Sequence, residues 1–477
     1  MTFKNTALMS INESNVEDIA GLYQKKYGAY IDAYNQFSIK RKINESLSPW
    51  EIAALGNQFD QFQNYRSFCE STNNLAALGV IPQIALDVIT ASVGTSIIPL
   101  LASVQPMREE HGIVYYKQIK SVNAAGGYTA GQVISDPLSR DNPGDGTFGT
   151  MRKTMVLTKT KVSTTEYDAN IPGVPVRPGF VELNVPGVGY GKDDYYGKIL
   201  GFGFSGTIDY ETGAVHLVFD KAPSADIDIS VIYDIDVDSA KSLDKIRGSL
   251  LTKDIRAKVW ALQADVGAFA SFAFNQRFGR SAVDEVAADL TTELTRTMNT
   301  AAVKELYAHS KGNVTWDAKP SQYISYTEHK LSFIDAIAQA EKNINKNSGA
   351  NAANRYICGA AAAAILRGMP NFQIADNAAT VSVGLYGTYD GIPVIRATDV
   401  IPDNEMLLVS NAGNYFNAPL AYAPFMPLMV TNTVQSVNNP FSSTQAAGIW
   451  AGLTTLNDNL ISKITIANTP IGTDVSA

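Results

Sequence analysis

Apolar residues recur every three or four positions in several long stretches of the chain, a pattern typical of amphipathic helices. One such helix is predicted to begin at Ser48-Pro49-Trp50-Glu51, where Ser48 can cap the helix and Glu51 can complete a capping box. Its apolar stripe would consist of Ile52, Leu55, Phe59, Phe62 and Phe68. Because this stripe needs a partner surface, residues 1–74 are predicted to form a helical arm that packs on this chain or on a neighbouring copy.

The longest helical pattern begins at the predicted cap Ser281-Ala282-Val283-Asp284 and runs for roughly 28 residues, about 40 Å at 1.5 Å per residue. Its predicted stripe is Val283, Val286, Ala287, Leu290, Leu294, Met298, Ala301 and Leu306. We expect helix throughout 243–310, and a second amphipathic helix over 326–346 that ends at Asn347-Ser348-Gly349. The tail, 350–477, is predicted to mix strands with one Ala-rich helix at 359–366.

Residues 120–238 show a different pattern, in which apolar and polar residues alternate between loops rich in Gly, Pro and Asp. Strands are predicted at 155–163 and 227–233. A hairpin is predicted from 208–210 and 214–219, which flank a tight turn at Glu211-Thr212-Gly213. Together these signals indicate a loop followed by a small β-domain that is inserted into a larger domain.

One segment imitates a membrane span, because residues 75–104 carry a single charge, Asp87. Pro82 and Pro99 interrupt this run, and a carboxylate in its middle is unfavourable in a bilayer. A buried core helix over 82–98 is therefore predicted. The N-terminus shows no apolar signal-peptide region, so we expect the protein to remain in the cytoplasm that made it or inside a particle assembled there.

Composition narrows the functional classes. The 477 residues are 45% hydrophobic and 18% charged, which is typical of a globular chain with two or three cores. A net charge of −8 argues against a dedicated nucleic-acid-binding protein. Cys69 and Cys358 are the two cysteines and lie far apart in sequence, which excludes a scaffold built on disulfides.

Two short motifs suggest ligand sites but have simpler explanations. Gly201-Phe202-Gly203-Phe204-Ser205-Gly206 matches the dinucleotide-binding pattern, yet a hairpin is predicted after it instead of the helix that the pyrophosphate needs. Asp234, Asp236 and Asp238 resemble the start of a calcium loop, but Ser239 and Lys245 stand where Gly and Glu are required. Glycines that shape a loop and a solvated strand edge account for these residues.

The remaining candidate residues do not form a catalytic pattern. The four histidines, His111, His216, His309 and His329, are dispersed without metal-ligand spacing. His216 is predicted to be a half-exposed sheet residue, and Cys358 a small core residue. We therefore predict that the protein is not an enzyme and has no catalytic residue, no cofactor and no metal site.

The order of several segments resembles that of the major capsid proteins of tailed bacteriophages, most closely the T-even and giant-phage branch. The resemblance begins with Ile81-Pro82, Ile97-Ile98-Pro99, Val104-Gln105-Pro106-Met107 and Gly112-Ile113-Val114-Tyr115-Tyr116. It continues through 253–258, Leu262, Phe278-Gly279, the long helix at 281, Asn354-Arg355-Tyr356-Ile357-Cys358-Gly359 and 421–428. Residues 178–233 resemble the β-domain that is inserted in the capsid subunits of large phages. The similarity covers about 75–460, and the arm at 1–74 matches only as a generic helical arm.

The resemblance implies an α+β chain with the Hong Kong 97-type capsid fold. The expected parts are an N-terminal helical arm (1–74), the start of the peripheral domain (75–119), an E-loop (120–165), an inserted β-domain (166–240), the peripheral domain with its spine helix (241–325), and an axial domain with the C-terminal return (326–477). It also implies hexamers and pentamers that close into an icosahedral head around double-stranded DNA. Portal, scaffold and decoration proteins are the implied partners, without sequence-specific DNA binding and without a membrane.

Three points stay open at this stage. A cellular nanocompartment shell with the same fold is the main alternative, and a β-rich receptor-binding virion protein is a weaker one. Arg152, Lys153, Lys159 and Lys161 are expected to meet acidic patches on neighbours in preference to DNA. Ile11-Asn12-Glu13-Ser14 and Ile43-Asn44-Glu45-Ser46 resemble the aliphatic-x-Glu sites that T-even-like prohead proteases cleave, but we expect the arm to stay intact.

Overall fold

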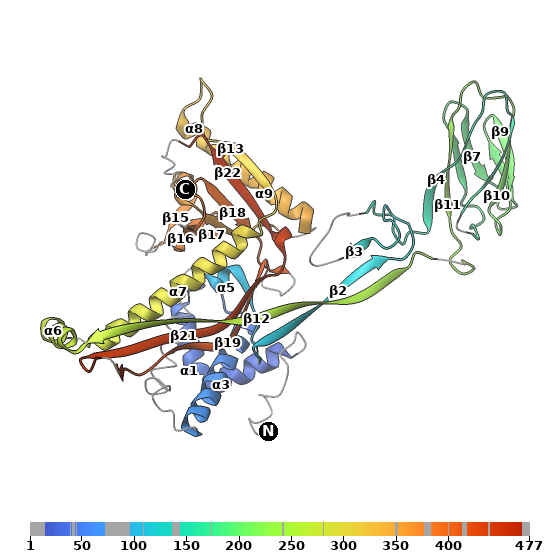
Figure 1. Ribbon diagram of the computed structural model, residues 1–477. Coiled ribbons are helices and arrows are strands. Elements are labelled where there is room, and N and C mark those ends of the chain that lie inside the picture. Colours follow the sequence, from blue (N-terminus) through green and yellow to red (C-terminus); the bar gives the residue numbers. More distant parts are fainter. Residues whose placement is uncertain are drawn as a thin grey trace. The chain divides into compact units, whose positions relative to one another are not determined.

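The computed structural model describes residues 15–38, 40, 43, 45–71, 96–107, 109–135, 144–172, 174–240, 243–279, 281–348, 352–375, 383–398, 400–412, 417–436 and 439–469. The chain divides into two compact units. The larger unit is formed by Met1–Tyr116, Pro137–Arg140 and Leu250–Ala477, and the smaller by Lys117–Asp136 and Asp141–Ser249. Figure 1 shows the elements of both units in chain order.

The helices all belong to the larger unit, as far as the described residues show. They are α1 (Val16–Phe37), α3 (Pro49–Ser71), α5 (Ile98–Leu101), α6 (Ala268–Phe278), α7 (Ala282–Ala308), α8 (Tyr326–Leu331), α9 (Phe333–Ser348), α10 (Ala360–Arg367) and the 3₁₀ turn η4 (Asp458–Leu460). A 7-stranded mixed sheet, called the axial sheet here, has the order β13 (Asn313–Asp317), β22 (Ile461–Ala467), β18 (Glu405–Val409), β14 (Arg355–Cys358), β17 (Ile392–Ala397), β16 (Val383–Tyr389) and β15 (Phe372–Ile374).

Helices cover both faces of the axial sheet. Every residue of β18 is buried. Along this strand, Met406 and Leu408 join a core that contains residues of α9 and α10, whereas Leu407 and Val409 join the core that contains residues of α7. Alternate side chains of a strand point to opposite faces, so an uninterrupted apolar run is what a strand buried on both faces requires.

The spine helix α7 packs on a second sheet, which lies in the larger unit except for residues 117–121, 133–135 and 246–249. This 7-stranded sheet has the order β1 (Ala102–Val104), β19 (Leu420–Val430), β21 (Ser442–Thr455), β12 (Ile246–Gly267), β2 (His111–Ser121) and β3 (Val133–Ser135), and β20 (Val434–Gln435) pairs with β21. The predicted stripe positions Leu290, Leu294, Met298 and Leu306 are buried against it. Near its end the buried positions are Ala302 and Val303, whereas Ala301 is half-buried. Ser281 precedes α7 as predicted, but its side chain makes no capping hydrogen bond.

The arm helices form a small core of their own. The predicted capping box at the start of α3 is confirmed: Ser48 N donates to Glu51 Oε2 at 2.7 Å, and Glu51 N donates to Ser48 Oγ at 3.3 Å. Phe59 and Phe62 of the predicted stripe are buried in a core shared with α1, and α3 also packs on β19. Phe68, by contrast, is exposed. Within the described residues, the partner surface of the stripe therefore belongs to the same chain.

The smaller unit contains one 8-stranded antiparallel sheet. Its order is β4 (Arg152–Lys159), β11 (Asp228–Asp234), β6 (Glu182–Val185), β7 (Gly189–Asp193), β8 (Lys198–Gly201), β9 (Phe204–Ile208), β10 (Ala214–Phe219) and β5 (Glu166–Asn170). The end strands β4 and β5 contact each other, so the sheet curls around one core. The predicted hairpin is confirmed as β9 and β10, which pair on either side of the turn at Gly213. The first strand of the sheet, β4, lies within the range predicted for the E-loop.

Three predicted elements need correction. Residues 246–267 form the strand β12, not a helix, and their exposure alternates from one residue to the next over most of that length. The strand predicted at 155–163 ends at Lys159, and Ser163 has a φ of 69°, which no strand adopts. The helix predicted at 326–346 is divided at Ser332 into α8 and α9.

The helix predicted at 82–98 stays a prediction. Nearly all of that range lies outside the described residues, and the short helix α5 begins at Ile98. In the described part of the chain, no helix has the length and apolar character needed to cross a membrane. The Ala-rich helix is confirmed as α10.

Candidate interaction surfaces

A buried arginine ties the arm to the axial sheet. The Nη2 atom of Arg355, at the start of β14, lies 2.8 Å from both carboxylate oxygens of Glu45. Its Nε donates to the backbone oxygen of Leu100 at 3.2 Å, an oxygen that also accepts from Asn411 Nδ2 at 3.0 Å. Only 9% of the Arg355 side chain is exposed, against 35% for Glu45. This charge-assisted contact of one arginine nitrogen with both carboxylate oxygens holds the segment before α3 in one place.

A second contact fixes the two arm helices to each other. Tyr27 of α1 donates from its hydroxyl to Asp60 Oδ1 of α3 at 2.6 Å, and Lys26 Nζ lies 2.5 Å from the same oxygen. Burial, and then the hydrogen bond to the Asp60 carboxylate, raise the pKa of the Tyr27 hydroxyl well above its usual range. The hydroxyl therefore remains a donor at neutral pH. The arm is thus a folded helical pair held by apolar and polar contacts.

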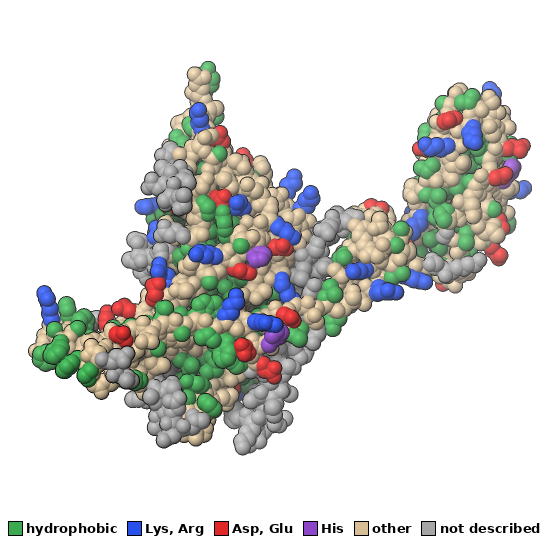
Figure 2. Space-filling view, viewed as in Figure 1, with side chains coloured by type: hydrophobic (Ala, Val, Ile, Leu, Met, Phe, Trp, Pro, Cys, Tyr) green, Lys and Arg blue, Asp and Glu red, His purple; other side chains and the backbone are tan. Residues whose placement is uncertain are grey.

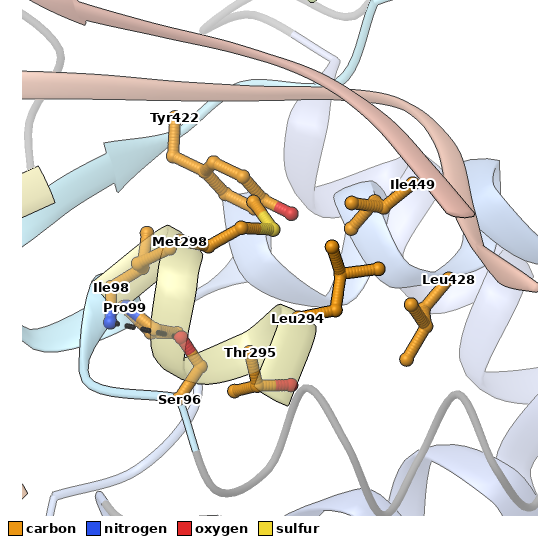
Figure 3. A pocket seen from close by; sticks show the side chains of 9 residues that line it. All are labelled: Ser96, Ile98, Pro99, Leu294, Thr295, Met298, Tyr422, Leu428 and Ile449. Carbon is orange, nitrogen blue, oxygen red and sulfur yellow. Dashed lines mark hydrogen bonds between the residues drawn. The ribbon is translucent and has the colours of Figure 1, made fainter. Parts of the chain in front are cut away.

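A small apolar cavity lies where the spine helix meets the second sheet (Figure 3). It has a volume of about 30 Å³, and its wall includes Leu294 and Met298 of α7 and Tyr422, Leu428 and Ile449 of the sheet region. Next to it, Asn299 Oδ1 accepts from Ser96 Oγ at 2.8 Å and from the backbone N of Ile97 at 3.3 Å. Asn299 is therefore the polar residue within the stripe that fixes the start of α5, a role that the apolar periodicity does not reveal.

Two carboxylates organise the smaller unit. Buried Asp193 accepts from the backbone N of Gly179 and Val181, at 2.5 and 3.0 Å, and from the Tyr210 hydroxyl at 2.9 Å. Burial, and then this hydrogen bond, raise the pKa of Tyr210 to about 12. Asp244 accepts from Lys153 Nζ at 2.9 Å, from the backbone N of Gly149 at 2.9 Å and from Asn123 Nδ2 at 3.1 Å.

Burial and hydrogen bonding shift the pKa of the Asp244 carboxyl in opposite directions. Burial alone would raise the pKa of its carboxyl, but the hydrogen bonds from Lys153, Gly149 and Asn123 outweigh burial and lower it. The carboxylate therefore stays charged and pins the loop before β4 to the segments at 123 and 244. Sequence analysis did not single out either carboxylate, because their partners are backbone groups and distant side chains.

Three of the four basic residues that the sequence singled out form ion pairs within the chain. Arg152 lies 3.3 Å from Glu182, Lys153 lies 2.9 Å from Asp244, and Lys159 lies 3.3 Å from Asp228. Each of these three residues therefore already has an acidic partner in its own chain, and their contact with acidic patches on neighbouring copies stays a prediction. Lys161 lies in the exposed turn after β4.

The two ligand-like motifs have structural roles. In Gly201–Gly206, Phe202 and Gly203 form the turn between β8 and β9, and Gly203 has a φ of 80°, which favours glycine. Asp234 ends β11, while Asp236 donates its backbone N to Pro175 O at 2.9 Å. The described residues contain no group of His, Cys, Asp and Glu side chains that could hold a metal ion.

The histidines and cysteines also lie apart from one another. His216 of β10 pairs with Asp168 at 2.7 Å and is half-exposed. His329 stacks on Trp316, His309 follows α7, and His111 begins β2. Cys69 and Cys358 are both buried, and burial raises the pKa of the Cys358 thiol far above its ordinary value. A buried, protonated thiol is a poor nucleophile, which agrees with a core role.

Exposed phenylalanines cover helix α6, which follows β12. Phe269, Phe272 and Phe278 are all largely exposed, and no residue of this 11-residue helix is buried. Phe441, which precedes β21, packs against Phe269 with tilted rings whose centroids lie 5.3 Å apart. This cluster of Phe269, Phe272, Phe278 and Phe441 is called the α6 patch below. Figure 2 shows the hydrophobic side chains gathered at that end of the larger unit.

Comparison with protein families decides the identity of the chain. The model of the family described as "Major capsid protein Gp23" matches residues 80–449, which is more than half of the sequence. The chain belongs to the Gp23 major capsid protein family. It is therefore a structural capsid subunit of a tailed bacteriophage that assembles with copies of itself into a virion shell. Family membership, with the order of arm, long strands, spine helix and axial sheet, confirms the predicted α+β capsid fold of the Hong Kong 97 type.

Comparison with solved structures gives weak matches. The capsid subunit is similar to a chain of Mycobacterium phage Che8, with 16% identity, a TM-score of 0.34, and coverage of 47% of this chain and 76% of that one. Similarity to "The capsid of Myoviridae Phage XM1" has 10% identity, a TM-score of 0.31, and coverage of 65% and 89%. An encapsulin complex from Synechococcus elongatus matches with 12% identity, a TM-score of 0.32, and coverage of 46% and 77%. No curated protein matches the sequence.

Proposed function

We propose that the subunit forms hexamers and pentamers that close into an icosahedral head around double-stranded DNA. The family match over residues 80–449 carries this proposal. The larger unit suits it, because α7 is packed along its buried stripe on the second sheet and also contacts the axial sheet, which makes a stiff element. Closed symmetry built from five- and sixfold clusters ends growth at a finite size. Electron microscopy of particles assembled from the purified subunit tests the proposal, and open tubes or sheets alone would contradict it.

The DNA inside would be enclosed without being bound through specific contacts. A net charge of −8, with Arg152, Lys153 and Lys159 already paired with carboxylates, supports this part of the proposal. Phosphate binding by lysine and arginine makes affinity strongly salt-dependent. We therefore expect the free subunit to show no salt-sensitive retention on DNA. Particles from infected cells should protect DNA from nuclease; particles that hold a protein cargo instead would indicate a nanocompartment.

Portal, scaffold and decoration proteins would complete the head, and assembly would take place in the host cytoplasm. A purely structural subunit needs no catalytic group of its own, so we propose that it is not an enzyme. Mass spectrometry of purified proheads and heads tests the partners. Proheads are expected to contain a scaffold protein that heads lack, and identical protein content in both would contradict the proposal.

The arm would remain attached in the mature head. The contact between Glu45 and Arg355 supports this, because the candidate cleavage site at Glu45-Ser46 begins with a carboxylate that is already bound. The other candidate, Glu13, lies outside the described residues. The division into arm, E-loop, inserted, peripheral and axial domains stays a prediction. Intact-mass measurement of subunits from DNA-filled heads should give the full chain, and a species starting at Ser14 or Ser46 would contradict an intact arm.

A further inference from the structure

Helix α6 is apolar on two opposite sides. At 100° per residue, Phe269 and Phe272 fall on one side, and Phe274 and Phe278 fall on the other. Phe274 and Phe278 pack against each other with tilted rings whose centroids lie 4.8 Å apart. An apolar side of a helix is normally packed against another part of the protein. In the described part of this chain, however, α6 has no buried residue.

The exposed aromatic area is large for a single chain. Phe269, Phe272, Phe278 and Phe441 are 74%, 68%, 59% and 58% exposed. With about 200 Å² for each ring, Phe269, Phe272 and Phe441 expose on the order of 400 Å² on one side of α6, within the range for the largest patch on a monomer, and Phe278 adds exposed aromatic area on the other side. An 11-residue helix is also marginal in water by itself. The α6 patch therefore indicates a surface that another protein covers.

The occupant is a second copy of this chain. Family membership establishes that copies of the subunit pack against one another in the shell. Charge agrees, because Arg277 of α6 and the acidic pair Asp284 and Glu285 at the start of α7 are exposed in every copy, and none of the three makes an ion pair with another described residue. Arg277 of one copy can therefore pair with Asp284 or Glu285 of the next copy.

We propose that α6 forms a ring contact, in which the Phe269/Phe272 side of one copy packs against the Phe274/Phe278 side of the next. A single symmetric pair would cover only one side of each helix. A head-to-tail contact repeated around a rotation axis covers both sides and closes on itself. This inference deepens the proposed function, since it names a local symmetry axis at which subunits of the shell meet.

Cysteine cross-linking tests the arrangement. Both native cysteines are buried, so introduced thiols are the exposed ones. The double variant Phe272→Cys/Phe278→Cys should give closed covalent rings of three or more chains in assembled particles under mild oxidation, whereas each single variant should stay largely monomeric. The matched control is Tyr323→Cys, which places a thiol at a residue that is 93% exposed outside α6. Covalent dimers from either single variant would overturn the ring contact, because they would mean that α6 meets α6 symmetrically.

A second variant separates assembly from folding. Phe272→Ser/Phe278→Ser removes one ring from each side of α6 without touching a buried residue. This variant should have the same urea midpoint of unfolding as the wild type, but its yield of particles should be at least tenfold lower. The control Tyr323→Ser should assemble normally. Normal particles from the α6 variant would overturn the inference alone. If the wild-type protein forms closed particles without icosahedral symmetry, the proposed function is contradicted. The cross-linking result would then still show whether α6 forms a ring contact.

Discussion

The spine helix offers the sharpest test of how the larger unit is held together. Leu294→Ala removes most of a side chain that is 1% exposed and that borders the apolar cavity of about 30 Å³ (Figure 3). Three buried carbons at about 0.8 kcal/mol each contribute about 2.4 kcal/mol. Roughly 40 Å³ of new empty volume at about 24 cal/mol per Å³ adds about 1 kcal/mol. We therefore expect the free energy of unfolding to fall by about 3–4 kcal/mol.

Tryptophan fluorescence during urea unfolding measures this change selectively. The 4 tryptophans, Trp50, Trp260, Trp316 and Trp450, all lie in the larger unit. The signal therefore reports that unit even when the smaller unit unfolds separately. With an m value of about 3 kcal/mol/M, the midpoint should shift down by about 1 M urea.

The matched control makes the same change at an exposed helical leucine. Leu331→Ala on α8 truncates a side chain that is 46% exposed, so its cost should stay below about 1 kcal/mol. If Leu294→Ala shifts the midpoint no more than Leu331→Ala does, the packing of α7 on the second sheet is not what stabilises this unit.

Three further predictions follow from the arm contact, the buried tyrosine and the loop. Arg355→Met should lower the free energy of unfolding by about 1–3 kcal/mol, because Glu45 loses its donor but remains partly hydrated. The same variant should be cleaved faster after Glu45 by a glutamyl endopeptidase. The control is Arg296→Met, which breaks an exposed ion pair, and equal cleavage of both variants would contradict the contact. Because the pKa of Tyr210 is about 12 in the folded chain and about 10 when unfolded, stability should fall as pH rises through this window, and Tyr210→Phe should remove one late-titrating group from the tyrosinate absorbance; an unchanged titration would refute this. Deleting 128–150 should leave a folded subunit by tryptophan fluorescence but abolish shells, and normal particles from the deletion would contradict a role of this loop in assembly.

Local signals in the sequence predicted local structure well. The capping box of Ser48 and Glu51 and the hairpin around Gly213 both depend on residues a few positions apart, and both are confirmed. The alternation in β12 was missed because it changes phase between Ala257 and Trp260, which breaks the strict period of two.

Long-range contacts could not be derived in this way. Arg355 and Glu45 are 310 residues apart, and no periodicity indicates that they meet. Asn299 lies among the buried residues of α7, where its partners Ser96 and Ile97 come from a distant segment. The α6 phenylalanines fit no helical stripe, because they point to two sides. Such features depend on the assembled fold or on other copies of the chain.

Cryo-electron microscopy of particles assembled from the purified full-length subunit tests the central claim most directly. The reconstruction should show closed shells with five- and sixfold clusters of the subunit, with α6 helices from neighbouring copies meeting around a common axis. A subunit that remains a monomer or a small soluble oligomer under all assembly conditions would contradict the account.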